Sequence, residues 1–378
     1  MPPECDLLLS IIIPVYNVEQ YLEKSLSSVA GQTLDKERIE VIVVDDASTD
    51  SSLAIAREFE ARFLNFHVIA LPENTPGGTG IPSNIAIRQA RGKYIGFVDG
   101  DDWVEPGMFE RMLEKAESEK ADLVIRDFKE YDELLAETIV SYDRIFLDAV
   151  AAQAFSQKNR MDQQKAFLKL SPVPWRKIYL RSFLLKNDIF YPEGNHFFED
   201  NPLHWFSLIL AERVVVLPEP LVVHRKNREG QTMCSGGEEF LAFVDHGRTI
   251  KTFLQSKRCY ADFKHDFLYW LINQCPWILP KMEAPLDGRF IKGVSSLLKD
   301  FNRSDLVDYF RLYPRKPVVM NRILSIVRGR SFLYLRLHLK FFRYISTLYT
   351  IFYIYGIRGG LKKIRKVPFS RLFSGEQD

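Results

Sequence analysis

Aspartates that directly follow apolar runs are the residues of this chain most able to do chemistry. Asp99, Asp101 and Asp102 come right after the apolar run at residues 94–98. Three carboxylates this close repel one another unless a cation lies among them, and Mg²⁺ or Mn²⁺ prefers such oxygen ligands. A solvated acidic turn that caps the next helix is the alternative. The place of the cluster after an apolar strand favours a metal site.

A second acidic step, Asp45-Asp46, ends the apolar run at residues 39–44. Asp46 could accept a hydrogen bond from an N–H or hydroxyl group of a ligand at the end of a strand. The same segment could equally be the turn that begins the next helix. The residues alone support the two interpretations to a similar degree.

A third acidic pair, Glu199-Asp200, precedes Asn201-Pro202, where we expect a helix to begin because proline is favoured in the first turn. Its neighbours are bulky and apolar: Phe197, Phe198, Trp205 and Phe206. A carboxylate at a helix N-terminus is stabilised in its charged form, as a general base requires. Helix capping alone would also explain both acids.

The elements that must position these acids follow from the apolar pattern. Apolar runs predict strands, and the segments between them have helical spacing; the runs lie at residues 8–15, 39–44, 66–71 and 94–98. Continuous apolar strands that alternate with helices indicate an α/β fold with a mostly parallel, doubly wound sheet. Ligands bind at the carboxyl ends of such strands, so two of the acidic clusters should share one ligand edge.

The middle of the chain is mixed. Strands are predicted at residues 121–128 and 214–224, and a loop into a helix at residues 172–181. The segment 72–82 carries three glycines and three prolines, and it could be either a mobile lid or a passive surface loop. Two amphipathic helices are expected further on, at residues 240–254 and 263–274.

The cysteines and the apolar segments exclude several classes of protein. Four scattered cysteines with no C-x-x-C spacing make a disulfide framework or a zinc site unexpected: Cys5, Cys234, Cys259 and Cys275. The N-terminus lacks the positive region of a signal peptide. The charge-free run Tyr344–Ile357 has 14 residues, fewer than the about 20 that span a bilayer. A reduced, cytoplasmic protein is the expectation.

The net charge of +2 hides two regions of opposite sign. Residues 309–378 hold 15 Lys and Arg against Glu376 and Asp378, a net of +13, while residues 1–308 hold 36 basic and 47 acidic residues, a net of −11. A basic tail rich in aromatics is typical of a segment that lies on an anionic membrane leaflet. A helical subdomain or an oligomer contact is the alternative. No recognised motif indicates a nucleic-acid partner.

Three blocks of the chain resemble the family-2 glycosyltransferases, in the order and spacing of that family: Ser10-Ile-Ile-Ile-Pro-Val-Tyr-Asn17, Glu40-Val-Ile-Val-Val-Asp-Asp-Ala-Ser-Thr-Asp50 and Gly92-Lys-Tyr-Ile-Gly-Phe-Val-Asp-Gly-Asp-Asp-Trp103. The resemblance covers residues 8–128 and continues more loosely to His224. It implies the GT-A fold, a nucleotide-sugar donor (a UDP-sugar is expected), inversion at the anomeric carbon, and Mg²⁺ or Mn²⁺.

The resemblance also implies roles for single residues. Pro14, Tyr16, Asn17 and Asp46 match positions around the donor base. Asp99 and Asp101 match the DXD acids that hold the ribose and the metal-bound diphosphate, and Asp102 beside them could share that work. Asp200, with Glu199 next to it, matches the expected catalytic base. His224 matches a late histidine near the metal.

One position departs from the family pattern. Related sequences carry Ala-Arg-Asn where this chain has Pro82-Ser83-Asn84, so Asn84 fits as a donor-binding residue but Ser83 replaces a basic one. The missing charge could come from Lys177, or from Arg88 or Arg176. Trp175 could stack on a sugar ring, or it could belong to the core.

The resulting prediction is a GT-A domain over residues 1–225, with a nucleotide-sugar half at 8–128 and an acceptor and base half at 129–225. A helical region, 226–308, and the basic aromatic tail would follow. The enzyme would transfer a sugar to a hydroxyl of a glycan or lipid-linked acceptor in cell-surface polysaccharide or glycolipid synthesis, on the cytoplasmic face of the membrane. A sugar nucleotidyltransferase and an inactive nucleotide-sugar- or glycan-binding scaffold are the alternatives.

Overall fold

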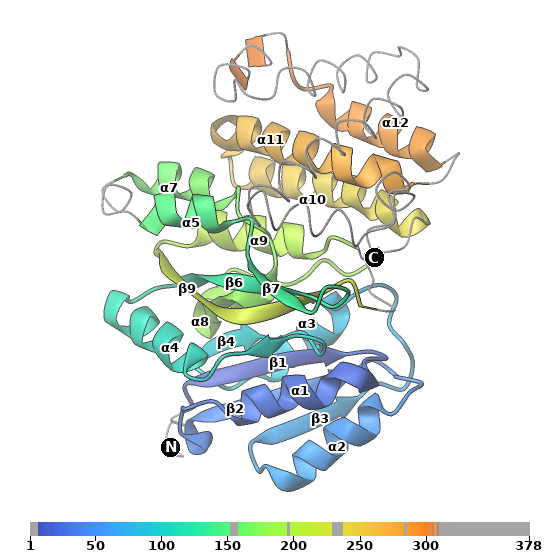
Figure 1. The fold of residues 1–378 in the computed structure, drawn as a ribbon. Helices are drawn as coiled ribbons and strands as arrows, with labels where there is room; N and C mark the ends of the chain where they lie inside the picture. The colour runs from blue at the N-terminus through green and yellow to red at the C-terminus, as the bar shows by residue number, and fades with distance from the viewer. Residues whose placement is uncertain are drawn as a thin grey trace. The chain divides into compact units, whose positions relative to one another are not determined.

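The computed structural model describes most of the chain before the basic tail: residues 7–151, 158–194, 197–228, 237–282, 286–302, 304–305 and 308–309. These residues fall into two compact units, one that ends at Lys226 and one that begins at Asn227 (Figure 1). The predictions for residues 310–378, including the membrane contact, lie outside the described residues.

The first unit is built on a sheet whose first four strands are parallel. They lie in the order β3-β2-β1-β4. Their bounds are β1 (Leu9–Val15), β2 (Ile39–Asp45), β3 (Phe66–Ala70) and β4 (Tyr94–Phe97). Every residue of β1, β2 and β4 is buried, as expected for strands covered on both faces. The register pairs Val15 with Asp45, so β1 and β2 end at the same edge.

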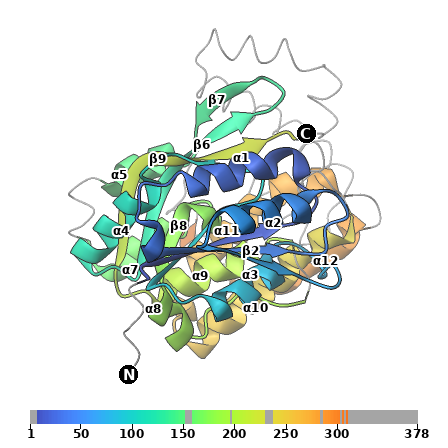
Figure 2. The ribbon, with the colours of Figure 1, turned by 90° about the horizontal axis from the view of Figure 1, so that it is seen from below.

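Helices cover both faces of this sheet. The connecting helices are α1 (Glu19–Ala30), α2 (Ser52–Arg62) and α3 (Gly80–Gln89), followed by α4 (Met108–Glu119). The chain moves outward from β1 through β2 to β3 and then returns to β4. Right-handed crossovers therefore put α1 and α2 on one face and α3 on the other (Figure 2). The direction reverses between β1 and β4, and ligands bind at such switch points.

The later strands extend the sheet in the order β4-β8-β6-β9-β5, with β7 beside β6. Their bounds are β5 (Trp103–Val104), β6 (Leu123–Asp132), β7 (Glu137–Val140), β8 (Lys177–Leu180) and β9 (Val214–Lys226). Every antiparallel pair involves β5, β7 or β8, whereas β6 and β9 run parallel. The predicted α/β fold with a mostly parallel sheet is confirmed.

Three short strands were not predicted, β5, β7 and β8, and β8 bears on the site. Residues 172–181 were expected to form a loop that leads into a helix, but β8 (Lys177–Leu180) lies between β4 and β6 and pairs antiparallel with both. The segment Lys-Ile-Tyr-Leu begins with a charged residue and forms no continuous apolar run, so the sequence pattern did not identify this strand. The insertion matters because β8 brings Lys177 into the centre of the sheet.

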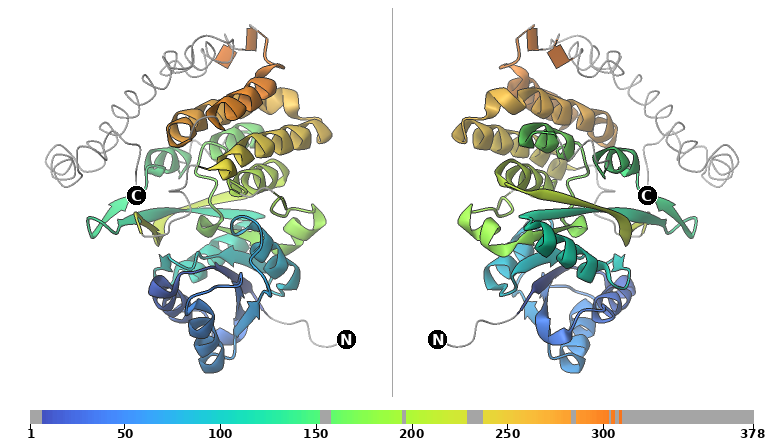
Figure 3. Two further views of the ribbon diagram at one scale, coloured as in Figure 1. Left: turned by 90° about the vertical axis from the view of Figure 1, so that its right-hand side faces the viewer. Right: turned by 90° about the vertical axis from the view of Figure 1, so that its left-hand side faces the viewer.

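Short helices complete the first unit: α5 (Arg144–Ala151), α7 (Arg160–Phe167), α8 (Arg181–Lys186) and α9 (Asp200–Leu210). Two turns of 3₁₀-helix also occur, at Lys36–Arg38 and Pro174–Arg176. Helix α9 begins at the predicted acid pair, with Pro202 in its first turn. The β6–β7 hairpin projects beyond the neighbouring strands in the side views (Figure 3).

The described part of the second unit is helical. Its helices are α10 (Ala242–Ser256), α11 (Tyr260–Ile278) and α12 (Leu286–Leu298), with 3₁₀-turns at Glu238–Leu241 and Leu279–Lys281. Aromatic rings form its core, with the ring of Phe243 4.5 Å from that of Trp270 and 5.8 Å from that of Phe290. Across the described residues, no helix has the length and apolar character needed to span a membrane.

Candidate active site

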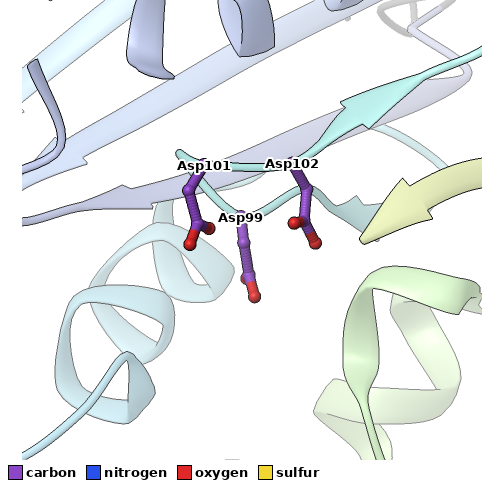
Figure 4. Close-up of side chains that lie close together, drawn as sticks. All are labelled: Asp99, Asp101 and Asp102. Atoms are coloured by element: carbon purple, nitrogen blue, oxygen red, sulfur yellow. The ribbon is translucent and has the colours of Figure 1, made fainter. Parts of the chain in front are cut away.

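The three aspartates of the first cluster lie in the turn that follows β4. Asp99, Asp101 and Asp102 each offer a carboxylate oxygen, and these oxygens lie within 4.8 Å of one another. Their side chains extend to the same side of the turn (Figure 4). The parallel register places this turn beside the end of β1, at the switch point of the sheet. The predicted acidic cluster is therefore assembled at the ligand edge.

Asp102 is held by residues near the end of β9. Its carboxylate lies 2.9 Å from Nδ1 of His224 and accepts the backbone N–H of Arg225 at 2.8 Å. Both oxygens of Asp102 are thus engaged within the protein. The Nε2 atom of His224 is the ring nitrogen left to meet a metal, and metal-binding histidines commonly pair their other nitrogen with a carboxylate. These contacts suit a role in which Asp102 orients His224 better than one in which Asp102 binds a metal itself.

The electrostatics of the cluster call for a cation. Burial, and then the charges of Asp102 and Asp101, raise the pKa of Asp99 well above its usual range. Burial also raises the pKa of Asp102, although His224 opposes this rise. Burial disfavours the charged form of His224, but the charge and hydrogen bond of Asp102 prevail and raise its pKa to about 9. A divalent cation with oxygen ligands fits this donor set, and its binding would release protons.

Asp46 follows β2 and is pinned to the loop after β3. Its carboxylate accepts hydrogen bonds from the backbone N–H of Thr75 at 2.8 Å, the Thr75 hydroxyl at 2.9 Å and the Asn74 side chain at 3.2 Å. The loop 72–82, predicted as a lid or a passive loop, is therefore anchored at this end. Burial raises the pKa of Asp46, and the bonds from Thr75 oppose that rise.

The first sequence block lies in β1 and in the turn after it. Pro14 is a buried residue of β1, while Tyr16 is 46% exposed at the ligand edge. Asn17 adopts a left-handed backbone conformation with φ of 49°, and its side-chain oxygen accepts the backbone N–H of Thr49 at 2.8 Å. Asn17 therefore ties the turn after β1 to the turn after β2, and Tyr16 is exposed beside it.

Glu199 and Asp200 begin α9, but their surroundings differ. The Glu199 carboxylate accepts the backbone N–H groups of Thr79 and Gly80 at the start of α3. A Cβ atom on Gly78 would collide with this carboxylate, so the approach requires a glycine there. Burial, and then the charge of Asp200, raise the pKa of Glu199 to about 8. Glu199 therefore serves as the cap of α3.

Asp200 lies within electrostatic reach of the first cluster, because its charge raises the pKa of Asp99. Burial raises the pKa of Asp200, while a backbone hydrogen bond at the helix start and the charge of Lys177 lower it. The fold thus brings a carboxylate at a helix start and the strand-end acids to one place, from positions a hundred residues apart. A carboxylate near a group of acids that could hold a metal is an arrangement that can serve a displacement reaction.

The basic side chains predicted to replace the missing charge at Ser83 have partners elsewhere in the structure. Ser83 is buried and its hydroxyl has no hydrogen-bond partner. Arg88 lies 3.4 Å from Glu193, and Arg176, fully buried, pairs with Asp143. Nζ of Lys177 lies 2.9 Å from Nδ1 of His204. Each of the three predicted substitutes is thus engaged with another side chain.

Asn84 is occupied by a structural contact. Its side-chain amide donates to the backbone carbonyl of Tyr191 at 2.9 Å, and its oxygen accepts the backbone N–H of the same residue at 2.9 Å. This two-bond contact holds α3 against the segment that leads to Glu199. Trp175 is 3% exposed and stacks on His224 at 5.0 Å, so it belongs to the support of the site.

Sequence reasoning missed His204 and Arg225 as members of this site. Arg225 donates from Nε to the backbone carbonyl of Asp101 at 3.0 Å and lies over the rings of Tyr21 and Trp103. The only signal in the sequence was the basic run after His224. His204 gave none, because its partner Lys177 is 27 residues away along the chain.

Comparison with known families gives one matching model. Residues 10–184 match the family described as "Glycosyl transferase family 2". A relative in Bacillus subtilis, "Uncharacterized glycosyltransferase EpsJ", is 34% identical over 229 residues, which cover 60% of this chain and 63% of that protein. The family match at residues 10–184 includes the strand-end acids and β8, and it ends before α9.

A second relative, TarS, matches both in sequence and in structure. The Staphylococcus aureus protein "Poly(ribitol-phosphate) beta-N-acetylglucosaminyltransferase TarS" is 32% identical over 226 residues, 60% of this chain and 37% of that protein. The chain thus spans less than two thirds of either relative. The structure of TarS residues 1–349 in complex with UDP has a TM-score of 0.61 at 22% identity, covering 86% of this chain and 93% of that one.

A more distant structure shares the fold. The mannosyltransferase PcManGT from Pyrobaculum calidifontis, in complex with GDP-Man and Mn²⁺, has a TM-score of 0.51 at 16% identity. It covers 88% of this chain and 84% of its own. At such identities the likeness concerns the fold alone, and together with the TarS structure it confirms the predicted GT-A fold.

Proposed function

Because the chain belongs to glycosyl transferase family 2, we propose that it transfers a sugar, with inversion, from a nucleotide-diphosphate sugar to an acceptor hydroxyl. The observation that carries the proposal is the place of Asp200 near the acids after β4, where its charge contributes to the raised pKa of Asp99. A metal-binding edge with a base near it is what a single displacement requires.

In this proposal Asp200 is the general base. It accepts the proton of the acceptor hydroxyl while the oxygen attacks the anomeric carbon and the bond to the diphosphate breaks. Help of this kind contributes typically about 10²–10⁴-fold to the rate. Glu199 is assigned a different role, because its carboxylate already accepts the N–H groups of Thr79 and Gly80.

The strand-end acids would hold Mg²⁺ or Mn²⁺. Asp99 and Asp101 are the proposed carboxylate ligands, with Nε2 of His224 as a further candidate and Asp102 orienting that histidine. A bound divalent cation would supply neutralisation of the charge that develops on the leaving diphosphate. The Mn²⁺ present in the PcManGT structure supports the choice of metal.

The donor base is proposed to lie at the ends of β1 and β2, against Tyr16 and Asp46. UDP-sugars are the proposed donors, because the structures of TarS contain UDP and UDP-GlcNAc. The proposed acceptor is a glycan or a lipid-linked glycan of the cell surface, in keeping with the poly(ribitol-phosphate) in the name of TarS.

The place of action proposed is the cytoplasmic face of the membrane, with residues 309–375 against the anionic leaflet. The support is the charge pattern alone, 15 basic residues and no acid between Tyr309 and Gly375. Co-sedimentation with anionic and neutral vesicles tests it, comparing the full chain with one that ends at Asp308. Equal pelleting of the two chains would overturn this part of the proposal.

The transferase proposal is tested by hydrolysis and transfer assays over a panel of nucleotide sugars with Mn²⁺ and with chelator. Release of nucleotide diphosphate from one donor, dependent on the metal, is the expected result. Formation of a sugar nucleotide from a sugar phosphate and a nucleoside triphosphate would instead indicate a nucleotidyltransferase. Donor binding without any turnover would indicate a scaffold.

A further inference from the structure

The acid turn, residues 99–102, is held by contacts to its backbone, and the proposed function assigns no role to the side chains that make them. Arg225, the residue before the last of β9, is 6% exposed. Its Nε donates to the backbone carbonyl of Asp101 at 3.0 Å, and its backbone N–H donates to Oδ1 of Asp102 at 2.8 Å. Its Nη1 pairs with the carboxylate of Glu133, in the turn after β6. One residue of β9 thus fixes two positions of the acid turn.

A helix holds the beginning of the same turn. The hydroxyl of Ser25, in α1, donates to the backbone carbonyl of Asp99 at 3.1 Å, and the backbone N–H of Asp102 donates to that carbonyl at 3.1 Å. The three aspartate side chains extend to one side of the turn (Figure 4). The contacts of Ser25 and of the Arg225 side chain are therefore made to the backbone of the acid turn and not to its carboxylates.

Aromatic rings fix the place of the Arg225 guanidinium. Its central carbon lies 4.6 Å from the ring centre of Tyr21, 5.1 Å from that of Trp103 and 5.6 Å from that of Tyr131. The rings of Trp103 and Tyr131 pack on each other at 5.4 Å. A planar guanidinium can stack on such rings and donate from several nitrogens at fixed angles, which an ammonium group cannot do. The direction of Nε toward the acid turn is thus set by the surrounding side chains.

A fixed backbone matters here because the acid turn gathers like charges. The carboxylate oxygens of its three aspartates lie within 4.8 Å of one another and repel when no cation is bound. A turn that is free to move would separate them, and a cation would then have to bring them together again. Groups that already stand in place lose less freedom when a ligand binds. A side chain that holds the turn can therefore raise the metal affinity without touching the metal.

We propose that Arg225 is a positioning residue, which holds the carbonyl of Asp101 so that the acid turn keeps the geometry that a divalent cation needs. The inference rests on the proposed function, in which Asp99 and Asp101 are the metal ligands. Arg225 contacts neither the metal nor the reacting atoms in this account. The group that acts is Nε and not the positive charge, because a positive charge by itself opposes the binding of a cation.

The experiment compares Arg225→Lys with Arg225→Gln in the full chain. Lysine keeps the charge but carries a methylene group at the place of Nε, whereas the amide nitrogen of glutamine can occupy that place without the charge. The probe is Mn²⁺ alone, titrated without nucleotide and followed by the electron paramagnetic resonance signal of the free ion. We expect Arg225→Lys to bind Mn²⁺ about tenfold more weakly than wild type, and Arg225→Gln to stay within about threefold of wild type.

Thermal denaturation verifies that the variants fold. Arg225→Met, which also lacks a donor at the place of Nε, replaces Arg225→Lys if that chain does not fold. Calorimetry with UDP in the absence of metal should give the wild-type affinity for every variant, because Tyr16 and Asp46 are untouched. Arg213→Lys, on a side chain 57% exposed that pairs with Glu119, is the matched control and should bind Mn²⁺ as wild type does.

A weaker affinity for Mn²⁺ in Arg225→Lys, with the affinity for UDP unchanged and with Arg225→Gln close to wild type, would support the inference. Equal Mn²⁺ affinities of Arg225→Lys and wild type would overturn it, and so would a greater loss in Arg225→Gln than in Arg225→Lys. A wild-type chain that binds no Mn²⁺ would instead remove the metal from the proposed function, and this inference with it.

Discussion

The two acid clusters of the site have similar composition but are built differently. The strand-end cluster, Asp99 to Asp102, lies in one turn and gathers its carboxylates within 4.8 Å. The helix-start pair, Glu199 and Asp200, lies in the first turn of α9. In both, one acid is engaged by a defined partner within the protein. Asp102 meets His224, and Glu199 meets the start of α3.

The difference lies in what offsets the charge of the acids. At the strand end the protein offers His224, and the remaining charge suits a divalent metal. At the helix start the protein offers the N–H groups of Thr79 and Gly80 to Glu199, and the charge of Lys177 lowers the pKa of Asp200. In the proposed assignment, the partners of each acid separate metal ligand, cap and base, and single substitutions test each role.

The largest effect is expected from Asp200→Asn, which removes the proposed base. The kcat for transfer should fall by about 10²–10⁴-fold, while donor KM changes little, because the donor-binding edge is untouched. Steady-state kinetics with saturating Mn²⁺ would measure both. Asp148→Asn, on a side chain 59% exposed, is the matched control and should keep wild-type rates. A fully active Asp200→Asn enzyme would refute the assignment of the base.

A smaller and different effect is expected within the strand-end cluster. Asp102→Asn should weaken metal-dependent donor binding by about 10–100-fold, as for a residue that orients a metal-binding histidine. Asp101→Ala should weaken it further, because a ligand itself is lost. Calorimetry with UDP, with and without Mn²⁺, gives both values. If Asp102→Asn weakened metal-dependent donor binding more than Asp101→Ala does, Asp102 would be the metal ligand.

The contact between the helix-start pair and α3 can be broken from the other side. Gly78→Ala places a Cβ against the carboxylate of Glu199, which must then move away from the N–H groups of Thr79 and Gly80. We expect a loss of about 1–3 kcal/mol in the free energy of unfolding, measured by denaturant titration. Gly288→Ala is the control, since no atom lies within 4 Å of a Cβ there. Equal stability of the two variants would show that the cap is adaptable.

The smallest effect is a pH dependence of stability. The folded-state pKa of Glu199 is about 8, above its usual 4.5, so the folded chain holds this proton more tightly than the unfolded chain. Stability from this group is present below pH 4.5 and is lost as the pH rises to 8. Glu199→Gln should therefore gain on wild type between pH 5 and 8, by on the order of 1 kcal/mol for each pH unit. A constant difference in melting temperature over this range would contradict the expectation.

Much of the fold followed from local pattern. The runs at β1, β2, β3 and β4 each appear as a strand within a residue or two of the predicted bounds, and those at β1, β2 and β4 are fully buried. The place of the acids after β2 and β4 then followed from the geometry of parallel strands, whose carboxyl ends share one edge. In contrast, β8 was not predicted, because its sequence Lys-Ile-Tyr-Leu begins with a charged residue and forms no continuous apolar run.

What the sequence by itself determined is the set of acids and their order along the chain, since residue type and strand-end position are local properties. Only the tertiary structure decided which acid meets which partner. Asp102 and His224 are 122 residues apart, and Lys177 and His204 are 27 apart. Such pairs depend on how strands align and helices pack, and a buried charge takes its pKa from all the groups around it. The division of labour among the acids is therefore a property of the folded chain.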